Sequence, residues 1–289
     1  MASANDKRRR LRDALHATEI VAAPGAGDPI TARLLELAGF PAVHVSGSVA
    51  HRMSGYSDAG ILTMHEMLER IIAMDAVSDI PLISDADTGF GGAVNVVRTV
   101  KEYERAGASA IHIEDQLTPK RPIHMGAAGA FISTTEMVDK IRAAVDSRTD
   151  SDFLVISRCD IPDQQEKLER LQACLEAGAD IGWLSSHDAD DTRLYTQAFG
   201  GKPSLGVLPR GLTLHEYQDA GASCAVLPGI LQIAALTAQR ALLEELKAKG
   251  TVVEYLSTLP HAEEMTQFYN RQGADELARI ETEYGGTGK

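Results

Sequence analysis

Two aspartates separated by one residue stand between an apolar run and a glycine-rich turn. The run is residues 80–83, the aspartates are Asp85 and Asp87, and the turn is residues 89–92. In a β-strand, side chains at positions i and i+2 point to the same side. We therefore expect Asp85 and Asp87 to project together from the carboxyl end of a buried strand.

The pattern recurs in residues 110–115, where an apolar run ends in Glu114 and Asp115. Two neighbouring strands that present carboxylates at the same end make a hard-oxygen site of the kind that Mg²⁺ prefers, with water and substrate oxygens completing its coordination. The alternative is that these acids cap the helices that follow, because Asp is common at N-caps. The repetition favours the metal, and we predict that Asp85, Asp87 and Glu114 hold it.

The composition excludes several classes of partner. The chain has 289 residues, of which 44% are hydrophobic and 24% are charged, as is typical of a globular protein. Its formal net charge of −13 argues against duplex nucleic acid or an anionic membrane surface. The basic cluster at residues 7–10 is most simply a solvated helix start. We expect no nucleic-acid partner and no membrane partner.

The cysteines and the N-terminus bear on the compartment. Cys159, Cys174 and Cys224 are odd in number and widely spaced without a zinc-binding pattern, which indicates reduced thiols in the core. No apolar segment follows the basic N-terminus as it would in a signal peptide. No apolar run approaches the ~20 residues of a membrane span. We therefore expect a cytoplasmic protein.

Eight short apolar runs, most of them followed by a segment with helical periodicity, organise the chain. Eight strand–helix units predict an α/β fold of the (β/α)₈ barrel type, in one domain spanning residues 1–289. A long helix is expected over 230–249, and a helical extension over about 250–285. The predicted strands are 20–24, 42–46, 80–84, 110–114, 153–157, 180–184, 204–208 and 224–228.

In such a barrel the functional residues lie at the carboxyl ends of the strands. Ser46-Gly47-Ser48 follows the second strand, where backbone N–H groups and hydroxyls can hold a carboxylate or phosphate. Asp58 lies in the next loop. Arg158 follows the fifth strand and is suited to a bidentate carboxylate clamp. The alternative for Arg158 is an ion pair with Asp160 or Glu114.

The segment after the fourth strand has the character of a lid. Residues 116–131 form a long connection that carries Lys120, Arg121 and His124 together with two glycines. Long, basic loops with glycines at the carboxyl end of a barrel often close over a bound substrate.

These motifs together resemble the isocitrate lyase / phosphoenolpyruvate mutase superfamily. The resemblance runs from about residue 12 to 260, and its combination of motifs is specific. It rests most strongly on the Asp85 motif, the Glu114 motif and Lys120-Arg121. The segments that carry it are 46–48, 85–91, 95–100, 112–116, 120–121, 136–138 and 143–146.

The resemblance implies a fold, a cofactor and a chemistry. It implies a (β/α)₈ barrel whose last helix is exchanged with a neighbouring subunit, in homotetramers built from such helix-swapped dimers. It implies Mg²⁺ (or Mn²⁺) and small 2-oxo or 2-hydroxy acids that react through a metal-stabilised enolate. We predict that Asp58, Lys120, His124 and Arg158 are catalytic. Substrate binding is assigned to Ser46, Gly47, Ser48, Asp87 and Arg158.

The chain departs from the lyase pattern in the segments that determine which substrate binds. The lyases follow the lid Lys-Arg with Cys-Gly-His, whose cysteine protonates the departing enolate, whereas this chain has Pro122 in place of the thiol. His124 is the nearest titratable group and could supply the proton; alternatively it only orders the closed lid. The lyases' Glu and Asn after strands six and seven are replaced by segments 184–187 and 206–210, which look more like the mutase, phosphonopyruvate hydrolase and oxaloacetate decarboxylase branches.

Three functions remain open from the sequence. The main hypothesis is a Mg²⁺-dependent lyase that breaks a C–C bond of a 2-oxo or 2-hydroxy acid by retro-aldol cleavage or decarboxylation. Its nearest alternative is a mutase or hydrolase acting on a phosphonate P–C bond. The third is a non-catalytic member that keeps the pocket for binding. The joint presence of the predicted metal-binding and catalytic residues favours an enzyme.

Overall fold

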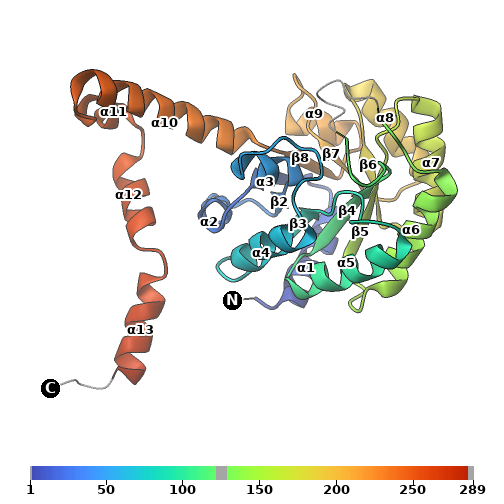
Figure 1. Cartoon of the computed structure of the whole chain (residues 1–289), viewed down its shortest axis with the longest axis horizontal. Coiled ribbons are helices and arrows are strands. Elements are labelled where there is room, and N and C mark those ends of the chain that lie inside the picture. The colour runs from blue at the N-terminus through green and yellow to red at the C-terminus, as the bar shows by residue number, and fades with distance from the viewer. Residues whose placement is uncertain (1, 122–128, 286–289) are drawn as a thin grey trace. The chain divides into compact units, whose positions relative to one another are not determined.

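The computed structural model describes residues 2–121 and 129–285. The chain forms two compact units, Met1–Gln232 and Ile233–Lys289. The first unit is a closed barrel of eight parallel strands in chain order, with β8 paired to β1 (Figure 1). The strands are β1 Val21–Ala26, β2 Val43–Val45, β3 Leu82–Asp85, β4 Ala110–Glu114, β5 Leu154–Arg158, β6 Ile181–Leu184, β7 Ser204–Val207 and β8 Cys224–Leu227.

This topology confirms the barrel predicted from the sequence. All eight strands overlap their predicted positions, and β4 occupies the predicted residues 110–114. Helices surround the strands in Figure 1. The helices of this unit are α1 Ala4–Leu15, α2 Pro29–Leu37, α3 Gly47–Met53, α4 Met64–Asp75, α5 Ala93–Arg105, α6 Thr134–Ser147, α7 Gln164–Glu176, α8 Ala189–Ala198 and α9 Leu214–Asp219.

Helix α5 shows how the apolar periodicity of the sequence sets the buried face of a helix and how a glycine ends it. Its buried residues include Val96, Val100 and Tyr103, which recur at the spacing of one helix face. The helix ends before Gly107, whose φ is +100° and whose missing side chain matters: a Cβ there would lie 2.2 Å from Asp75 Cγ. Glycine is needed at this turn because the chain both adopts a left-handed conformation and passes close to α4.

The core has two layers, as in other barrels of this type. One layer fills the barrel and includes Ile83, Ile156 and Leu205. The other packs the outer faces of the strands against the helices and includes Ile111 and Val155. Inward and outward side chains alternate along each strand, so both faces must be apolar, and the strands therefore read as continuous hydrophobic runs.

Half of the basic cluster at residues 7–10 is not solvated, contrary to the prediction. Lys7 and Arg8 are 1% and 4% exposed. The Lys7 ammonium lies 2.8 Å from Asp75 Oδ1 and donates to the Ser78 carbonyl at 2.6 Å. The cluster therefore holds α1 against the barrel, and a helix-start pattern alone did not indicate this.

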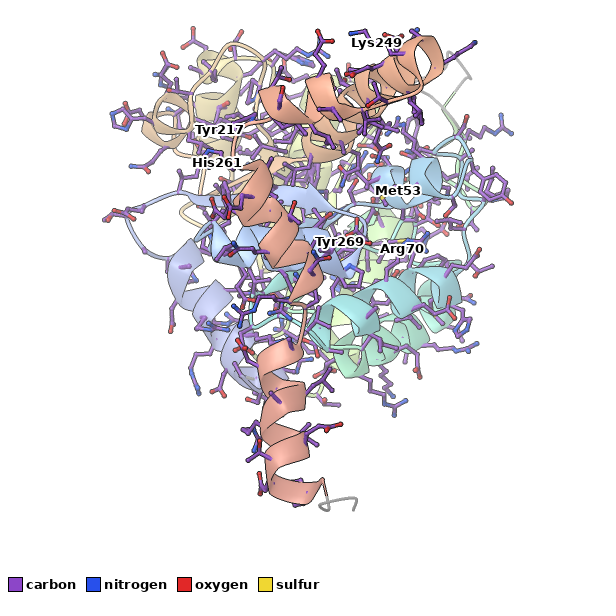
Figure 2. All side chains as sticks on the ribbon, turned by 90° about the vertical axis from the view of Figure 1, so that its left-hand side faces the viewer. Met53, Arg70, Tyr217, Lys249, His261 and Tyr269 are labelled. Carbon is purple, nitrogen blue, oxygen red and sulfur yellow. The ribbon has the colours of Figure 1, made fainter. Side chains whose placement is uncertain are left out.

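The second unit is helical, and none of its described residues, 233–285, is buried. Tyr269, labelled in Figure 2, is 69% exposed, and Leu236 is 64% exposed. The single domain over 1–289 stays a prediction, because this segment forms a compact unit of its own. No described helix is long and apolar enough to cross a membrane. The helices are α10 Ile230–Lys249, which begins just before the unit, α11 Val253–Thr258, α12 Ala262–Asn270 and α13 Ala274–Tyr284.

Candidate active site at the carboxyl end of the barrel

A cavity of about 500 Å³, here called the core cavity, opens at the carboxyl ends of the strands. The structure brings to it six of the residues predicted from the sequence, and it adds Asp160 and Trp183, which the sequence reasoning did not assign to the site. The predicted residues that line it are Ser46, Ser48, Asp58, Asp85, Lys120 and Arg158.

Asp85 and Asp87 come together by a different route from the one predicted. Strand β3 ends at Asp85, so the two do not share a strand. Asp87 has a φ of +45°, a left-handed conformation that a non-glycine residue adopts at a cost and that is common at functional sites. Its N–H donates to Asp85 Oδ1 at 2.9 Å. A tight turn, rather than strand alternation, therefore holds this pair.

Asp85 receives a second backbone donor from the turn after β2. The Gly47 N–H donates to Asp85 Oδ2 at 3.1 Å. A Cβ at position 47 would lie 2.6 Å from the same oxygen, so only glycine allows this approach. Ser46 caps α3 by accepting the Val49 N–H, and its hydroxyl lies 3.1 Å from that of Ser48. The predicted Ser-Gly-Ser segment thus touches the predicted metal ligand.

Neither Asp85 nor Asp87 is a helix cap, which removes the alternative considered from the sequence. The N-cap of α5 is Gly92. Elsewhere aspartates do cap: Asp28 caps α2 and Asp163 caps α7. Asp87, just after β3, and Glu114, at the end of β4, instead lie around one ammonium group.

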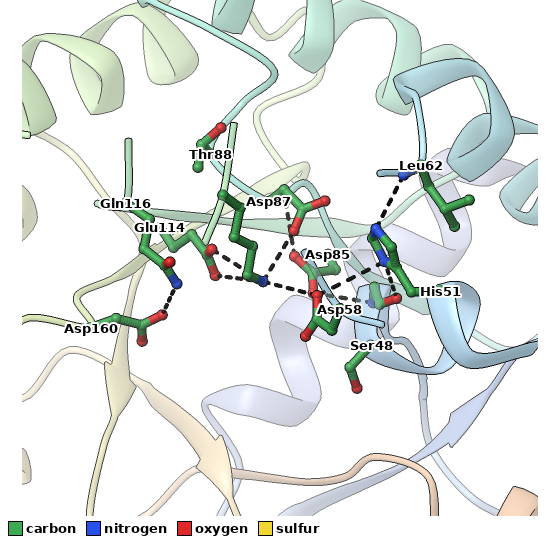
Figure 3. A network of polar contacts seen from close by, with 12 residues as sticks. Ser48, His51, Asp58, Leu62, Asp85, Asp87, Thr88, Glu114, Gln116 and Asp160 are labelled. Atoms are coloured by element: carbon green, nitrogen blue, oxygen red, sulfur yellow. Dashed lines mark hydrogen bonds and ion pairs between the residues drawn. The ribbon is translucent and has the colours of Figure 1, made fainter. Parts of the chain in front are cut away.

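The Lys120 ammonium lies among three carboxylates from three different segments. Its Nζ is 3.3 Å from Asp58 Oδ1, 3.2 Å from Asp87 Oδ1 and 3.2 Å from Glu114 Oε1. Dashed lines in Figure 3 mark these contacts at Asp58, Asp87 and Glu114. Burial opposes the charge of Lys120, but Glu114 and Asp87 outweigh it and raise the lysine pKa. Lys120 is therefore held as a cation.

Arg158 makes the ion pairs that were its alternative role. Its Nε and Nη2 each donate to Asp160 at 2.9 Å, and its Nη1 lies 3.3 Å from Glu114 Oε2. The guanidinium also lies 4.9 Å from the centre of the Trp183 ring, within the range of a cation–π contact. Asp160 thus occupies the fork in this structure, and the carboxylate clamp stays a prediction.

The buried carboxylates differ in their readiness to ionise. Burial raises the pKa of Glu114 to about 8, even though Arg158 and Lys120 act in the opposite direction. Burial, together with the charge of Asp85, raises the pKa of Asp87. For Asp85, burial acts in the same direction but is outweighed by His112, Lys120 and Arg158, so its pKa is lowered. Asp85 is therefore the acid that is most firmly ionised.

His51 was not selected from the sequence, yet it ties two parts of the site together. It is fully buried, and its Nδ1 lies 2.8 Å from the Gly47 carbonyl oxygen. Its Nε2 accepts the N–H groups of Ile61 and Leu62, both at 3.1 Å, and Figure 3 shows the contact with Leu62. The imidazole is therefore neutral with its proton on Nδ1. It joins α3 to the loop that carries Asp58, and nothing in the local sequence pattern distinguishes it.

The residues present fit a hard divalent ion. Asp58 Oδ1 and Glu114 Oε1 are buried without a hydrogen-bond partner among the described residues, although both lie near Lys120. No three His, Cys, Asp or Glu side chains in residues 2–121 and 129–285 form a closed metal site. Mg²⁺ usually keeps several waters and needs only one or two carboxylates, so Asp85 with Asp87 suits it, with Glu114 farther out.

The described parts of the predicted lid lie at its base. Gln116 pairs with Phe131 in an isolated bridge, and the Leu117 N–H donates to the Ala130 carbonyl at 2.8 Å. Lys120 is buried and Arg121 lines the core cavity. Pro122 and His124 lie outside the described residues, so the predicted role of His124 stays a prediction.

Comparisons with known proteins agree with this geometry. Residues 11–247 match the family described as phosphoenolpyruvate phosphomutase. The chain is 35% identical to the 2,3-dimethylmalate lyase of Eubacterium barkeri over 286 residues, covering 95% of this chain and 97% of that protein.

Two solved structures resemble the whole chain. The phosphoenolpyruvate phosphomutase of Streptomyces platensis subsp. rosaceus superposes with a TM-score of 0.88 at 30% identity, covering 96% of this chain and 99% of that one. A phosphonopyruvate hydrolase in complex with oxalate and Mg²⁺ has a TM-score of 0.86 at 33% identity, with the same coverage of 96% and 99%.

Proposed function

Because the chain belongs to the isocitrate lyase/phosphoenolpyruvate mutase superfamily, as the motifs of its sequence indicated, we propose that it is a Mg²⁺-dependent carbon–carbon lyase. Its substrate is a small 2-oxo or 2-hydroxy carboxylic acid, and the reaction passes through an enolate. Bond cleavage occurs by retro-aldol reaction or by decarboxylation.

One observation carries this proposal. Asp58, Asp87 and Glu114 converge on Lys120 beside a cavity at the carboxyl end of the barrel, within 3.3 Å of its ammonium group. Burying several carboxylates together is costly, and such clusters with strongly shifted pKa values concentrate at catalytic sites. A structural role alone does not require them to border a cavity.

The chemistry follows from where charge develops. Mg²⁺, when bound by Asp85 and Asp87, supplies positive charge that stabilises a developing enolate oxygen. The Ser46-Gly47-Ser48 turn and Arg158 orient the substrate carboxylate. Lys120 carries a fixed positive charge next to Asp87 and Glu114, and preorganised charges of this kind lower the barrier without reorganising during the reaction.

Asp58 and His124 are the candidates for moving protons. Asp58 lies 3.3 Å from Lys120 and 3.9 Å from His51 Nδ1, so its position is fixed before substrate enters. A retro-aldol reaction needs a base for the 2-hydroxyl group of the substrate, and we assign that role to Asp58. His124 on the lid would protonate the enolate, in place of the cysteine that Pro122 replaces.

A phosphonate substrate is the second candidate. The relative with bound oxalate and Mg²⁺ is a phosphonopyruvate hydrolase, and its structure covers 96% of this chain. The same metal, the same carboxylate-binding turn and Arg158 would serve cleavage of a P–C bond. Substrate preference, rather than the metal half of the site, separates the two functions.

The helical segment after the barrel supports an oligomer. Its apolar side chains are exposed in the single chain, among them Ile233, Leu236 and Leu277. Exposed apolar surface of this extent marks an interaction site. We propose that it packs on another subunit by helix exchange, in a homotetramer. The three free, buried cysteines agree with a reducing, cytoplasmic compartment.

A turnover screen tests the proposed function. The purified protein would be offered oxaloacetate, 2-methylisocitrate, 2,3-dimethylmalate and phosphonopyruvate, each with Mg²⁺ and each with a chelator. We expect chelator-sensitive formation of a 2-oxo acid from a C–C substrate. Release of inorganic phosphate from phosphonopyruvate alone would assign the second candidate. Oxalate that does not bind in the presence of Mg²⁺ would contradict both.

A further inference from the structure

The segment between α3 and α4, residues 54–62, carries Asp58 but is neither helix nor strand. Within residues 2–121 and 129–285, the backbone of its second half, residues 57–62, makes no hydrogen bond to other backbone groups. This half nevertheless passes close to Lys120, because a Cβ at Gly60 would lie 3.0 Å from the Lys120 Cβ. Contacts other than backbone pairing must therefore hold it in place.

The imidazole of His51 supplies these contacts. Its Nε2 accepts the N–H groups of Ile61 and Leu62, and no other described side chain bonds to the backbone of residues 57–62. The ring is fixed at its other nitrogen as well, because Nδ1 donates to the Gly47 carbonyl at 2.8 Å. That donation leaves Nε2 without a proton, which is the form needed to accept two amides. His51 therefore holds the segment from a fully buried position on α3.

The position of Asp58 depends on this support. Its Oδ1 is buried without a hydrogen-bond partner among the described residues, and it lies 3.3 Å from the Lys120 ammonium. Two other carboxylates share that ammonium group, so the ion pair alone does not fix where Asp58 lies. The backbone fixes it from both sides: before Asp58, the Tyr56 N–H donates to the His51 carbonyl at 2.9 Å, and after it, two amides donate to the His51 ring.

We propose that His51 is a positioning residue for Asp58. By accepting the two amides that follow Asp58, it keeps that carboxylate at the core cavity, where it receives the proton of the substrate's 2-hydroxyl group. Asp58 lines the cavity, whereas His51 is fully buried behind it and does not touch the substrate. This inference rests on the proposed function, in which Asp58 is the base, and it adds a residue to that mechanism.

Two substitutions separate the contacts of His51. His51→Asn can still donate to the Gly47 carbonyl, because its amide group takes the place of Nδ1, but it is too short to reach Ile61 and Leu62. His51→Gln places a carbonyl oxygen where Nε2 lies, so it can accept both amides. If the contact only stabilised the fold, the two variants would bind ligands alike. If it positions Asp58, the asparagine variant is defective and the glutamine variant is close to the wild type.

Competition binding measures the position of Asp58 without turnover. Trp183 is the only tryptophan of the chain and lines the core cavity, so its fluorescence reports the displacement of oxalate in the presence of Mg²⁺. Lactate and pyruvate differ at one carbon, and only the 2-hydroxyl group of lactate can donate to Asp58. We expect His51→Asn to weaken lactate roughly tenfold relative to pyruvate, the usual worth of a hydrogen bond to a charged group. His51→Gln and the exposed control His65→Asn should stay within twofold of the wild type.

A double-mutant cycle shows whether His51 acts through Asp58. Asp58→Ala should lose the same affinity for lactate, and adding His51→Asn to it should cause no further loss, because both changes remove one interaction. On the C–C substrate found in the turnover screen, His51→Asn should lower kcat roughly 10²-fold through its effect on the base. The Mg²⁺ concentration that gives half the maximal rate should stay within twofold.

The outcomes separate this inference from the proposed function. If oxalate does not bind to the wild type with Mg²⁺, the proposed function is wrong and the inference falls with it. If oxalate binds but His51→Asn keeps the wild-type ratio of lactate to pyruvate affinity, or lowers it further in the Asp58→Ala background, His51 does not position Asp58. Equal losses in His51→Asn and His51→Gln would also overturn the inference.

Circular dichroism would verify that the variants fold. If His51→Asn does not fold, Ile61→Pro takes its place, because it removes one of the two amide donors at a residue that is 50% exposed and leaves His51 intact. It should show part of the same loss of lactate affinity relative to pyruvate. An unchanged ratio in folded Ile61→Pro protein would overturn the inference.

Discussion

The rim of the barrel at β2–β4 and the rim at β6–β7 are built on opposite plans. At β2–β4 the charged side chains are buried, acidic in excess and in contact with one another, as at Asp85, Asp87 and Glu114. At β6–β7 the charged side chains that line a cavity there are basic and more exposed, and neither Lys167 nor Arg210 has an ion-pair partner among the described residues. In the first rim the charged groups contact one another before any ligand binds, whereas in the second the cations are available to a ligand.

This difference separates the groups that carry out the reaction from the groups that select the substrate. A preorganised, buried cluster stabilises charge in a transition state because it need not rearrange. An accessible pair of cations binds any anion of suitable size. Its two residues can be replaced without disturbing the buried cluster. Relatives that act on different substrates can thus share one rim and vary the other.

Removing a carboxylate from the β2–β4 rim should have the largest effect. Asp85→Asn and Asp87→Asn should each lower Mg²⁺-dependent kcat/KM by roughly 10³-fold or more, since they weaken charge stabilisation at the reacting oxygen. Steady-state kinetics and Mg²⁺ calorimetry measure this. Asp190→Asn, at an exposed position on α8, is the control and should be unaffected. Normal activity in both rim variants would refute the metal assignment.

Arg158 lies between the two rims, so its substitution tests whether the two rims function independently. Arg158→Ala should cost about 2–5 kcal/mol of substrate binding, much of it because Glu114 and Asp160 lose their partner. Arg158→Lys keeps the charge but loses the fork, so it should also be impaired. The measurement is kcat/KM on the substrate found in the screen. An unchanged value in the alanine variant would show that Arg158 serves only the ion pairs seen here.

The lid acid comes next in size. His124→Gln should lower kcat roughly 10²-fold and remove the ionisation near neutral pH from the rate profile, if His124 protonates the enolate. His215→Gln, at an exposed position on α9, controls for loss of a histidine. A wild-type rate with an unchanged profile would leave His124 as part of the lid and favour decarboxylation, in which solvent supplies the proton.

The last prediction concerns stability rather than activity. The pKa of Glu114 is about 8 in the folded chain against an ordinary 4.5, so between these values the folded state retains a proton that the unfolded state has released. This contribution to stability is complete below pH 4.5 and is lost as pH rises through about 8. Denaturant unfolding of the metal-free protein should show this decline, and Glu114→Gln should reduce it. Glu69→Gln, on the surface of α4, should not. A wild-type profile that rises over this window and is unchanged by Glu114→Gln would refute the assignment.

The fold was predictable because its signals are local and repeated. Eight apolar runs alternating with helical periodicity left few arrangements, and the strand positions followed from the runs themselves. The boundary near residue 232 was not predicted, because α10 is one continuous helix across it. Pro228 and Gly229 follow Val226, the last buried residue that the structure describes, but they precede α10 and therefore do not mark the boundary within that helix.

The site was predictable only where one residue type is chemically required. Asp85, Asp87 and Glu114 stood out because carboxylates after buried strands need a reason. Asp160 was weighed only as an ion-pair partner of Arg158, although it takes the whole fork of that arginine. His51 was missed because its contacts join α3 to a loop, and no spacing rule describes such a contact. The cavity at the carboxyl ends of β6 and β7 is formed by residues with no shared motif.

The bonding of His51 has a consequence that can be read in hydrogen exchange. Ile61 is 50% exposed as a residue, and backbone amides in exposed loops ordinarily exchange fast. Its N–H and that of Leu62 instead point to the buried Nε2 of His51. These amides can exchange only when the segment around Asp58 lifts from α3. Their exchange rates therefore report how often that segment opens. Measuring them with and without oxalate and Mg²⁺ would show whether ligand binding changes this opening, and no substrate turnover is needed.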